Sequence, residues 1–341
     1  MGRVLRTRLL LSLAVLLMTT LSYSAEHEAV DADKIMASTG FKIDREKLMQ
    51  SELLVFARGD KENVDSEIAL DMLLYLDAPY EAVLKELQKG ENQLSDYSDA
   101  IAVKVDDLDD PSSALSKLHF SPDEQDEVDR LMAYDEGDSF NFSEAEIKRL
   151  HLLRAHATSK KESAESFMRE VLAERMKAYH KRGVHSIAAY ERGHTVHIDK
   201  DLKKGSQDLQ VLKRWFDYFY EDFLHYPDVK DTHYTQKFYW VKDAMEGRPV
   251  FILKHQMVHE QPGATVIAER QFYISHGLDG LQVEIICMPY KGGTILGMGA
   301  QTFTGKVAGM GGLVAHKIGR MQMEKELRPM FVNLQRKFAK K

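Results

Sequence analysis

The sequence predicts an α+β fold in which one antiparallel sheet is covered by a long C-terminal helix. After Pro227 the apolar residues stop recurring every three or four positions and begin to alternate, as the residues of strands do. Short breaks that contain glycine separate the alternating runs, and such breaks are typical of hairpins. From residue 305 the helical period returns. A sheet with an apolar face needs a cover, and one long amphipathic helix can provide it.

The composition belongs to a folded protein with a substantial core. The chain has 341 residues, of which 44% are hydrophobic and 29% charged, and only 8 are proline. The single cysteine, Cys287, excludes a disulfide scaffold, and its apolar surroundings in the sequence predict a buried, inert thiol. After the first two dozen residues, no apolar stretch is long enough to span a bilayer.

The N-terminus has the features of a secretory signal peptide. Three arginines precede an uncharged run at 9–21, and Ser22 and Ser24 supply the small residues that a cleavage site requires. We therefore expect residues 1–24 to be removed and the mature protein to be periplasmic or secreted. An uncleaved amphipathic anchor is the alternative interpretation.

Charge is distributed unevenly along the mature chain. Removing the three arginines of the signal peptide leaves 43 basic against 53 acidic residues, a net charge of −10. Residues 25–150 carry a net charge of −19 and residues 151–341 a net charge of +9. The overall sign disfavours nucleic acid as a partner. The acidic region at 25–150 is a possible surface for a protein partner.

The elements before the sheet are mostly helical. Residues 25–66 predict a short helical or irregular lead-in, and an alternating strand at 68–76 leads through Ala78-Pro79 into a helix at 80–87. A largely helical insertion follows at about 88–225, where capping boxes begin at Ser121 and Ser143. The helices expected in the insertion lie at about 122–134, 144–158, 162–182 and 207–224.

The sheet core is expected at 228–303 and the C-terminal helix at 305–338, so that one domain covers 67–341. Proline at 329 predicts a kink in that helix. The strands expected in the core are 236–241, 249–259, 265–276, 281–289 and 294–303.

Two parts of the chain resemble known proteins. The strand, Ala78-Pro79 and helix at 68–88 look like the first unit of the START-like, helix-grip superfamily of lipid-binding domains. The stretch 183–303, with Tyr239-Trp240, His255 and the run Arg270 to His276, is similar to a group of uncharacterised exported bacterial proteins. The resemblance implies a sheet that grips a long C-terminal helix, and it brings no known activity. A minimal helix-grip domain lacks this insertion. The insertion is therefore either part of the same domain or a separate helical domain.

Alternating residues of the predicted strands give a candidate ligand-binding face. If this face lines a space under the C-terminal helix, His255, Arg270 and His276 become polar groups in an apolar cavity, and the guanidinium can pair with a ligand anion. The other interpretation is that Arg270 pairs with an internal acid such as Glu269 or Glu284. The candidate ligand-binding residues are Trp240, Phe251, Leu253, His255, Met257, Arg270, Phe272, His276, Met298 and Gly309.

The sequence contains no complete catalytic, metal-binding or cofactor-binding motif. The histidine pairs at 255/259 and 194/197 supply too few converging ligands for zinc. The chain has no nucleophile elbow, and the glycines from 297 onward match no dinucleotide fingerprint. We therefore assign no catalytic residue, no metal ligand and no cofactor.

The sequence favours a non-enzymatic binding or carrier protein for an apolar or amphipathic molecule held between the sheet and the C-terminal helix. A structural or interaction protein with a self-filled core is the alternative, and a hydrolytic or metal-assisted enzyme is the least favoured class. A continuous apolar void of roughly several hundred Å³ would separate the first two.

Overall fold

The computed structural model describes residues 30–58, 65–87, 100–230, 233–308 and 312–339. The predicted signal peptide and Gly309 lie outside these residues. Across the described ranges, no helix is both long enough and apolar enough to cross a membrane.

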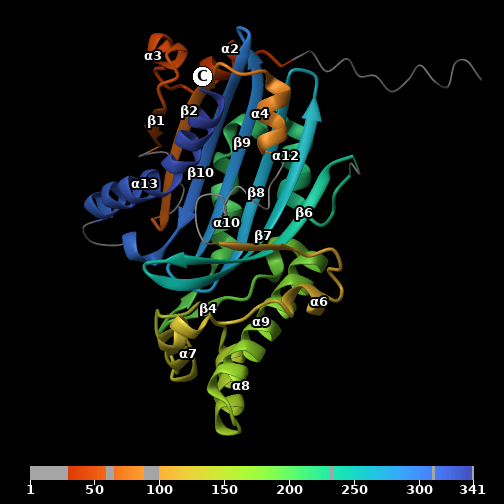
Figure 1. Ribbon diagram of the computed structural model, residues 1–341, viewed down its shortest axis with the longest axis vertical. Coiled ribbons are helices and arrows are strands. Elements are labelled where there is room, and N and C mark those ends of the chain that lie inside the picture. The colour runs from red at the N-terminus through yellow and green to blue at the C-terminus, as the bar shows by residue number, and fades with distance from the viewer. Residues whose placement is uncertain (1–29, 59–64, 88–99, 231–232, 309–311, 340–341) are drawn as a thin grey trace, which may run out of the picture.

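An antiparallel sheet of eight strands forms the centre of the molecule (Figure 1). The order across the sheet is β1-β2-β10-β9-β8-β7-β6-β3. The last five strands of the chain, β6 to β10, therefore form a continuous meander. The predicted α+β class with a large antiparallel sheet is therefore confirmed. The strands are β1 (Leu54–Ala57), β2 (Glu67–Leu76), β3 (Ile101–Lys104), β6 (Thr235–Met245), β7 (Arg248–Gln261), β8 (Ala264–Ile274), β9 (Gly280–Tyr290) and β10 (Gly293–Phe303).

Two-residue turns fix the register of the meander. Glu246 and Gly247 between β6 and β7 have φ values of 55° and 75°, and Lys291 and Gly292 between β9 and β10 have values of 47° and 83°. Two successive positive φ angles are the mark of the type I′ turn, whose twist matches that of the flanking strands. Glycine at the second position of each turn adopts this conformation without a steric penalty.

One face of the sheet carries α4 (Tyr80–Leu87) and the C-terminal helix α13 (Gly312–Phe338). Leu74 of β2 and Leu296 of β10 pack there against Phe331 and Leu334 of α13. The helix expected from residue 305 begins later than predicted, after the short 3-10 turn η5 (Gly305–Val307). We refer to this side as the α13 face.

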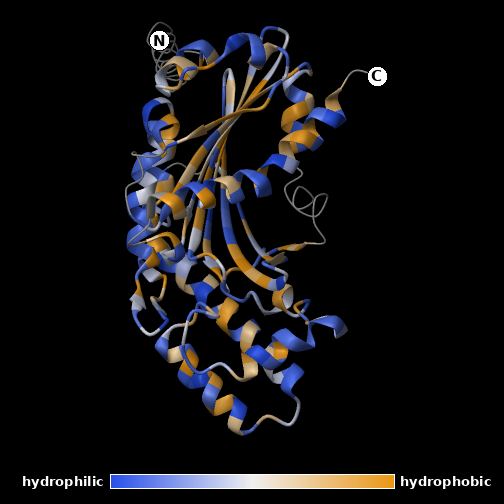
Figure 2. Ribbon diagram, turned by 90° about the vertical axis from the view of Figure 1, so that its left-hand side faces the viewer, coloured by the Kyte–Doolittle hydropathy of each residue, from blue (hydrophilic) through white to orange (hydrophobic). Residues whose placement is uncertain are grey.

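The opposite face is covered by the helical insertion and by α2 (Ala32–Ser38) of the lead-in. Figure 2 shows the curved sheet between the two layers of helices. We refer to this side as the insertion face. The helices of the insertion are α6 (Ser112–Leu115), α7 (Gln125–Met132), α8 (Glu144–Ala155), α9 (Lys160–Arg182), α10 (Ile198–Gly205), α11 (Gln210–Trp215) and α12 (Asp217–His225).

The insertion shares its core with the sheet. Its two capping boxes are present at Ser121 and Ser143, where each serine and the glutamate three residues later satisfy one another's backbone N–H groups. The buried side of α9 places Phe167 and Tyr179 in one apolar cluster with Leu253 and Phe272 of the sheet. The two parts therefore bury each other's apolar surface.

Candidate functional site

An apolar chamber lies on the insertion face, between the first helix of the described chain and one side of the sheet. Its walls come from α2, the segment 39–43, β1 and α11, and its base from β2, β9 and β10. The cavity measures about 60 Å³, which is room for a few water molecules or a small apolar group. Only Thr39, Asp71 and Glu284 among its lining residues carry polar side chains.

Local sequence signals explain why α2 forms one wall. Asp31 caps the helix by accepting hydrogen bonds from the backbone N–H groups of Asp33 (2.8 Å) and Lys34 (3.1 Å). Ile35 and Met36 on the inward side of α2 are buried and line the chamber. The indole N–H of Trp215 donates to Ser38 Oγ at 2.9 Å, which ties the end of α11 to the end of α2.

A stacked aromatic pair forms the wall that borders solvent. The rings of Phe41 and Phe56 lie 4.7 Å apart at an interplanar angle of 12°. Both residues line the chamber, and both are only half-buried. The pair joins the segment 39–43 to the edge strand β1.

Two glycines of β10 shape the base of the chamber. A Cβ atom at Gly297 would lie 3.0 Å from Ile286 Cγ2, and one at Gly299 would lie 2.7 Å from Glu284 Oε1 and would collide with the guanidinium of Arg58. Because Gly299 has no side chain, the side chain of Arg58, which directly follows β1, can lie over β10 and reach Glu284 on β9. The glycines therefore leave space for the cavity and for the charged group below it.

The charged group is a cluster of Arg58, Asp71 and Glu284, which we call the floor cluster. Arg58 Nε and Nη2 donate to the two oxygens of Asp71 at 2.7 and 2.8 Å, a bidentate pair. The same Nη2 reaches Glu284 Oε1 at 3.3 Å, and Nη1 donates to the carbonyl of Asp208 at 2.9 Å. Both Arg58 and Glu284 are buried.

Burial and charge set the protonation of the floor cluster. Burial raises the pKa of Glu284 to about 7, and the positive charge of Arg58 only partly opposes this. Burial would lower the pKa of Arg58, but the hydrogen bond and the charge of Asp71, with those of Glu284 and Asp208, raise it overall. The guanidinium is therefore always charged, whereas Glu284 changes its protonation near neutral pH.

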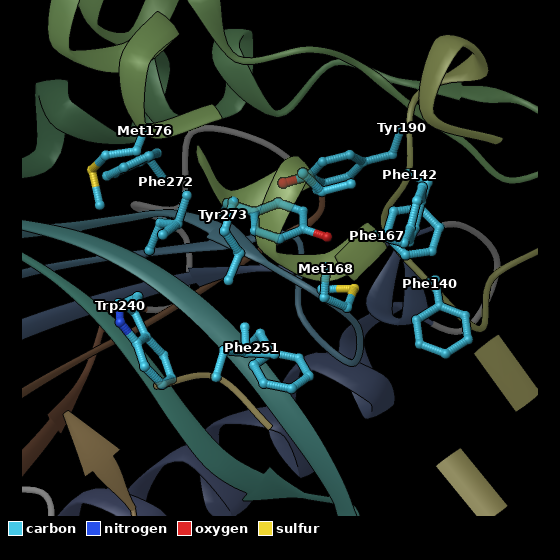
Figure 3. Packing of buried hydrophobic residues seen from close by; sticks show 14 of the residues in the cluster. Phe140, Phe142, Phe167, Met168, Met176, Tyr190, Trp240, Phe251, Phe272 and Tyr273 are labelled. Carbon is cyan, nitrogen blue, oxygen red and sulfur yellow. The ribbon is translucent and has the colours of Figure 1, made fainter. Parts of the chain in front are cut away.

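The residues predicted from the sequence to bind a ligand lie elsewhere on the sheet. Trp240, Phe251, Leu253 and Phe272 face α9 and the rest of the insertion, where they are almost completely buried among its side chains (Figure 3). They do not lie beneath α13, because α13 covers the other face. Alternation identifies which residues share a face, but both faces of this sheet are covered.

The polar members of that predicted set form internal hydrogen bonds. Arg270 is fully buried and donates to Gln282 Oε1 (3.0 Å), to the hydroxyl of Tyr179 (3.0 Å) and to the carbonyl of Phe223 (3.4 Å). Its guanidinium also lies 4.2 Å from the ring centroid of Phe223. Within the described ranges it forms no ion pair, so the acid expected from the sequence is replaced by neutral acceptors and an aromatic ring.

His255 is held neutral in the same network. Burial and the charge of Arg270 keep its pKa well below the ordinary value. Because the hydroxyl of Tyr179 accepts from Arg270, it donates to His255 Nδ1 at 3.2 Å, and His255 Nε2 then donates to Gln236 at 3.2 Å. Every nitrogen of the imidazole is therefore satisfied within the core.

The three remaining described members of the predicted set are also dispersed. Met257 packs in the cluster that contains α2 and α12, and His276 bonds through Nε2 to the carbonyl of Pro249 at 3.0 Å. Met298 belongs to the α13 face and is the one predicted residue that also lines the chamber. In the described part of the chain, no group of three or more His, Cys, Asp or Glu residues is placed to hold a metal ion.

Sequence reasoning missed the residues that build the chamber. Two signals were present. Asp71 and Glu284 are the charged residues in the interiors of β2 and β9, and Gly297 and Gly299 lie on one face of β10. The wall from α2 and the segment 39–43 left no such signal.

Comparisons with known proteins give no relative. No protein-family model matches the chain, and no curated protein or solved structure has significant similarity to it. The START-like relationship therefore stays a prediction.

Proposed function

We propose that the protein is an exported, non-enzymatic binding protein for a small apolar or amphipathic molecule, held in the chamber between the sheet and α2. One observation carries this proposal, which is the apolar cavity with a buried charged group at its base. Binding sites for small molecules combine mostly apolar walls with a few convergent polar groups. The chamber replaces the site under the C-terminal helix that the sequence suggested.

The size of the chamber limits the ligand. A cavity of about 60 Å³ suits a compact molecule or one end of a longer chain. A bulky lipid enclosed as a whole would require α2 or the segment 39–43 to move.

The alternative is an interaction protein whose core is filled by its own side chains. It is favoured by the close packing of Trp240, Phe251 and Phe272 against the insertion, where a carrier was expected to hold its ligand. It is also favoured by the volume of the chamber, about 60 Å³, which is well below the roughly several hundred Å³ expected of a carrier cavity. The two functions differ in whether the chamber takes up a foreign molecule.

Methyl NMR with n-hexanol as probe distinguishes these two functions. Met36 and Met288 line the chamber, whereas Met132 and Met168 lie in the core of the insertion. On protein labelled at the methionine methyl groups, we expect n-hexanol to shift the signals of the first pair with saturation and to leave the second pair unchanged.

A filled chamber supplies the control. Val211 lines the chamber from α11, so V211F should place a ring in the cavity and abolish the saturable shifts. L152F makes a comparable enlargement on α8, where Leu152 is 69% exposed, and should leave binding intact. Absence of saturable shifts in the wild-type protein, or equal binding by V211F, would contradict the proposed function.

A further inference from the structure

The floor cluster contains more negative than positive charge. Within the described ranges, its two acids, Asp71 and Glu284, share the one guanidinium of Arg58. Both acids also line the chamber. A ligand that enters the chamber therefore meets a surplus of carboxylate at its base.

The arginine is shared unequally between the two acids of the chamber. Asp71 receives both short bonds, at 2.7 and 2.8 Å, and this is the geometry of a complete carboxylate–guanidinium pair. Glu284 receives one contact of 3.3 Å from Arg58 and one of 3.4 Å from the backbone N–H of Leu212. Both contacts are long for hydrogen bonds of this kind. Glu284 is therefore buried and incompletely neutralised.

We propose that the ligand of this chamber carries a protonated amine at its polar end, which pairs with the carboxylate of Glu284 while the apolar part fills the chamber. An ammonium group supplies the positive charge and the short donors that Glu284 lacks. A ligand carboxylate would instead meet two like charges in a site from which water is largely excluded. This inference rests on the proposed function and names the class of its ligand.

The inference reverses the expectation drawn from the sequence. Arg270 had suggested an acidic ligand, but its guanidinium lies within the core, is bonded to Tyr179 and Gln282, and does not line the chamber. The cation that does lie beneath the chamber, Arg58, is already bound by Asp71.

Three probes with the same apolar tail test the ligand class. The probes n-hexylamine, n-hexanol and n-hexanoate are titrated into the wild-type protein at about pH 8, where Glu284 is mostly ionised, and the methyl signals of Met36 and Met288 are followed. We expect the amine to bind about tenfold more tightly than the alcohol, as a charge-assisted hydrogen bond provides. The carboxylate should bind most weakly.

The outcomes separate this inference from the proposed function. If all three probes bind but the carboxylate equals or exceeds the amine, the inference fails and the binding function stands. If none binds in the chamber, the proposed function fails. Both conclusions come from the wild-type protein and need no variant.

E284Q then tests which acid is responsible. This variant keeps an acceptor beside Arg58 but loses the charge, so the preference for the amine over the alcohol should disappear. E144Q is the matched control, because Glu144 is an exposed acid on α8 that pairs with Lys148 and does not line the chamber. Circular dichroism verifies that both variants are folded. A preference for the amine that persists in folded E284Q, or that E144Q also removes, would overturn the assignment to Glu284.

Discussion

At the scale of single residues, two buried arginines of this protein are neutralised in different ways. Arg175 of α9 makes two short bonds to the carboxylate of Glu146, at 2.8 and 2.7 Å. Arg270 of β8 meets only neutral oxygens and the ring of Phe223. Removing one partner of a buried ion pair leaves an isolated charge, whereas removing Arg270 leaves only neutral acceptors.

The variants R175M and R270M should therefore differ in stability. R175M leaves the Glu146 carboxylate buried without its cation, so we expect a loss of about 3–5 kcal/mol in the free energy of unfolding. R270M should cost about 1–3 kcal/mol, because Gln282 still bonds to Ser206 and Tyr179 to His255. Urea denaturation measures both. A loss in R270M as large as that in R175M would reveal an anionic partner for Arg270.

Glu284 should make the stability of the protein depend on pH. Its pKa is about 7 in the folded protein and about 4.5 in the unfolded chain. Between these values the folded state binds more protons than the unfolded chain. The contribution of Glu284 to the free energy of unfolding therefore falls as pH rises from about 4.5 to about 7. Over this pH range the contribution of Glu284 to the free energy of unfolding changes by at most about 3 kcal/mol.

E284Q removes this titration, and its stability relative to the wild-type protein should therefore increase across that pH window. Denaturation of both proteins at several pH values checks the sign. A difference between the two proteins that is constant with pH would contradict the raised pKa.

At the scale of elements, β10 depends on the absence of side chains at one point. The floor cluster crosses the strand at Gly299, where even a Cβ would meet Arg58 and Glu284. We expect G299A to lose about 2 kcal/mol of stability, as overpacking of a fixed site does. G305A is the matched control, because no atom of the described residues lies within 4 Å of a Cβ at Gly305.

Thermal denaturation of the two variants tests this account of β10. G305A should remain close to the wild-type protein. A tolerated alanine at 299 would show that the cluster can move aside, and the close approach of Arg58 would then not be required.

Most elements of eight or more residues, including α4 at 80–87, were predictable from the sequence, whereas the four-residue strands were not. The strands from β6 to β10 and the helices α8 and α9 were predicted within a few residues, because the alternating or helical period of apolar residues extends over many positions in them. β1 and β3 have four residues each and form the two edges of the sheet, so too few positions exist for a pattern to appear. β1 carries Phe56, and the loss of this strand from the prediction concealed one wall of the chamber.

At the scale of the whole molecule, the sheet is covered on both faces, and the sequence does not say which helix covers which face. Leu74 and Leu73 are neighbours in β2, and both are buried, the first on the α13 face and the second on the insertion face. An apolar strand of this kind lacks the clean alternation that marks a sheet with one solvated face. The candidate residues from Trp240 to Phe272 were therefore grouped correctly on one face but assigned to the wrong cover.

The arrangement as a whole places the chamber where three separate parts of the chain meet. The lead-in supplies α2 and Arg58, the insertion supplies α11, and β2, β9 and β10 of the sheet form the base with Asp71 and Glu284. We propose, as the central claim, that this chamber holds a ligand in the folded protein.

Native mass spectrometry tests that claim most directly. The protein is isolated gently from its source, as the wild-type chain and as V211F, and the two intact masses are compared. We predict a retained small molecule on the wild-type protein, of a mass consistent with an amine-bearing apolar compound, and its loss from V211F. Two unliganded proteins, or the same adduct on both, would contradict the claim.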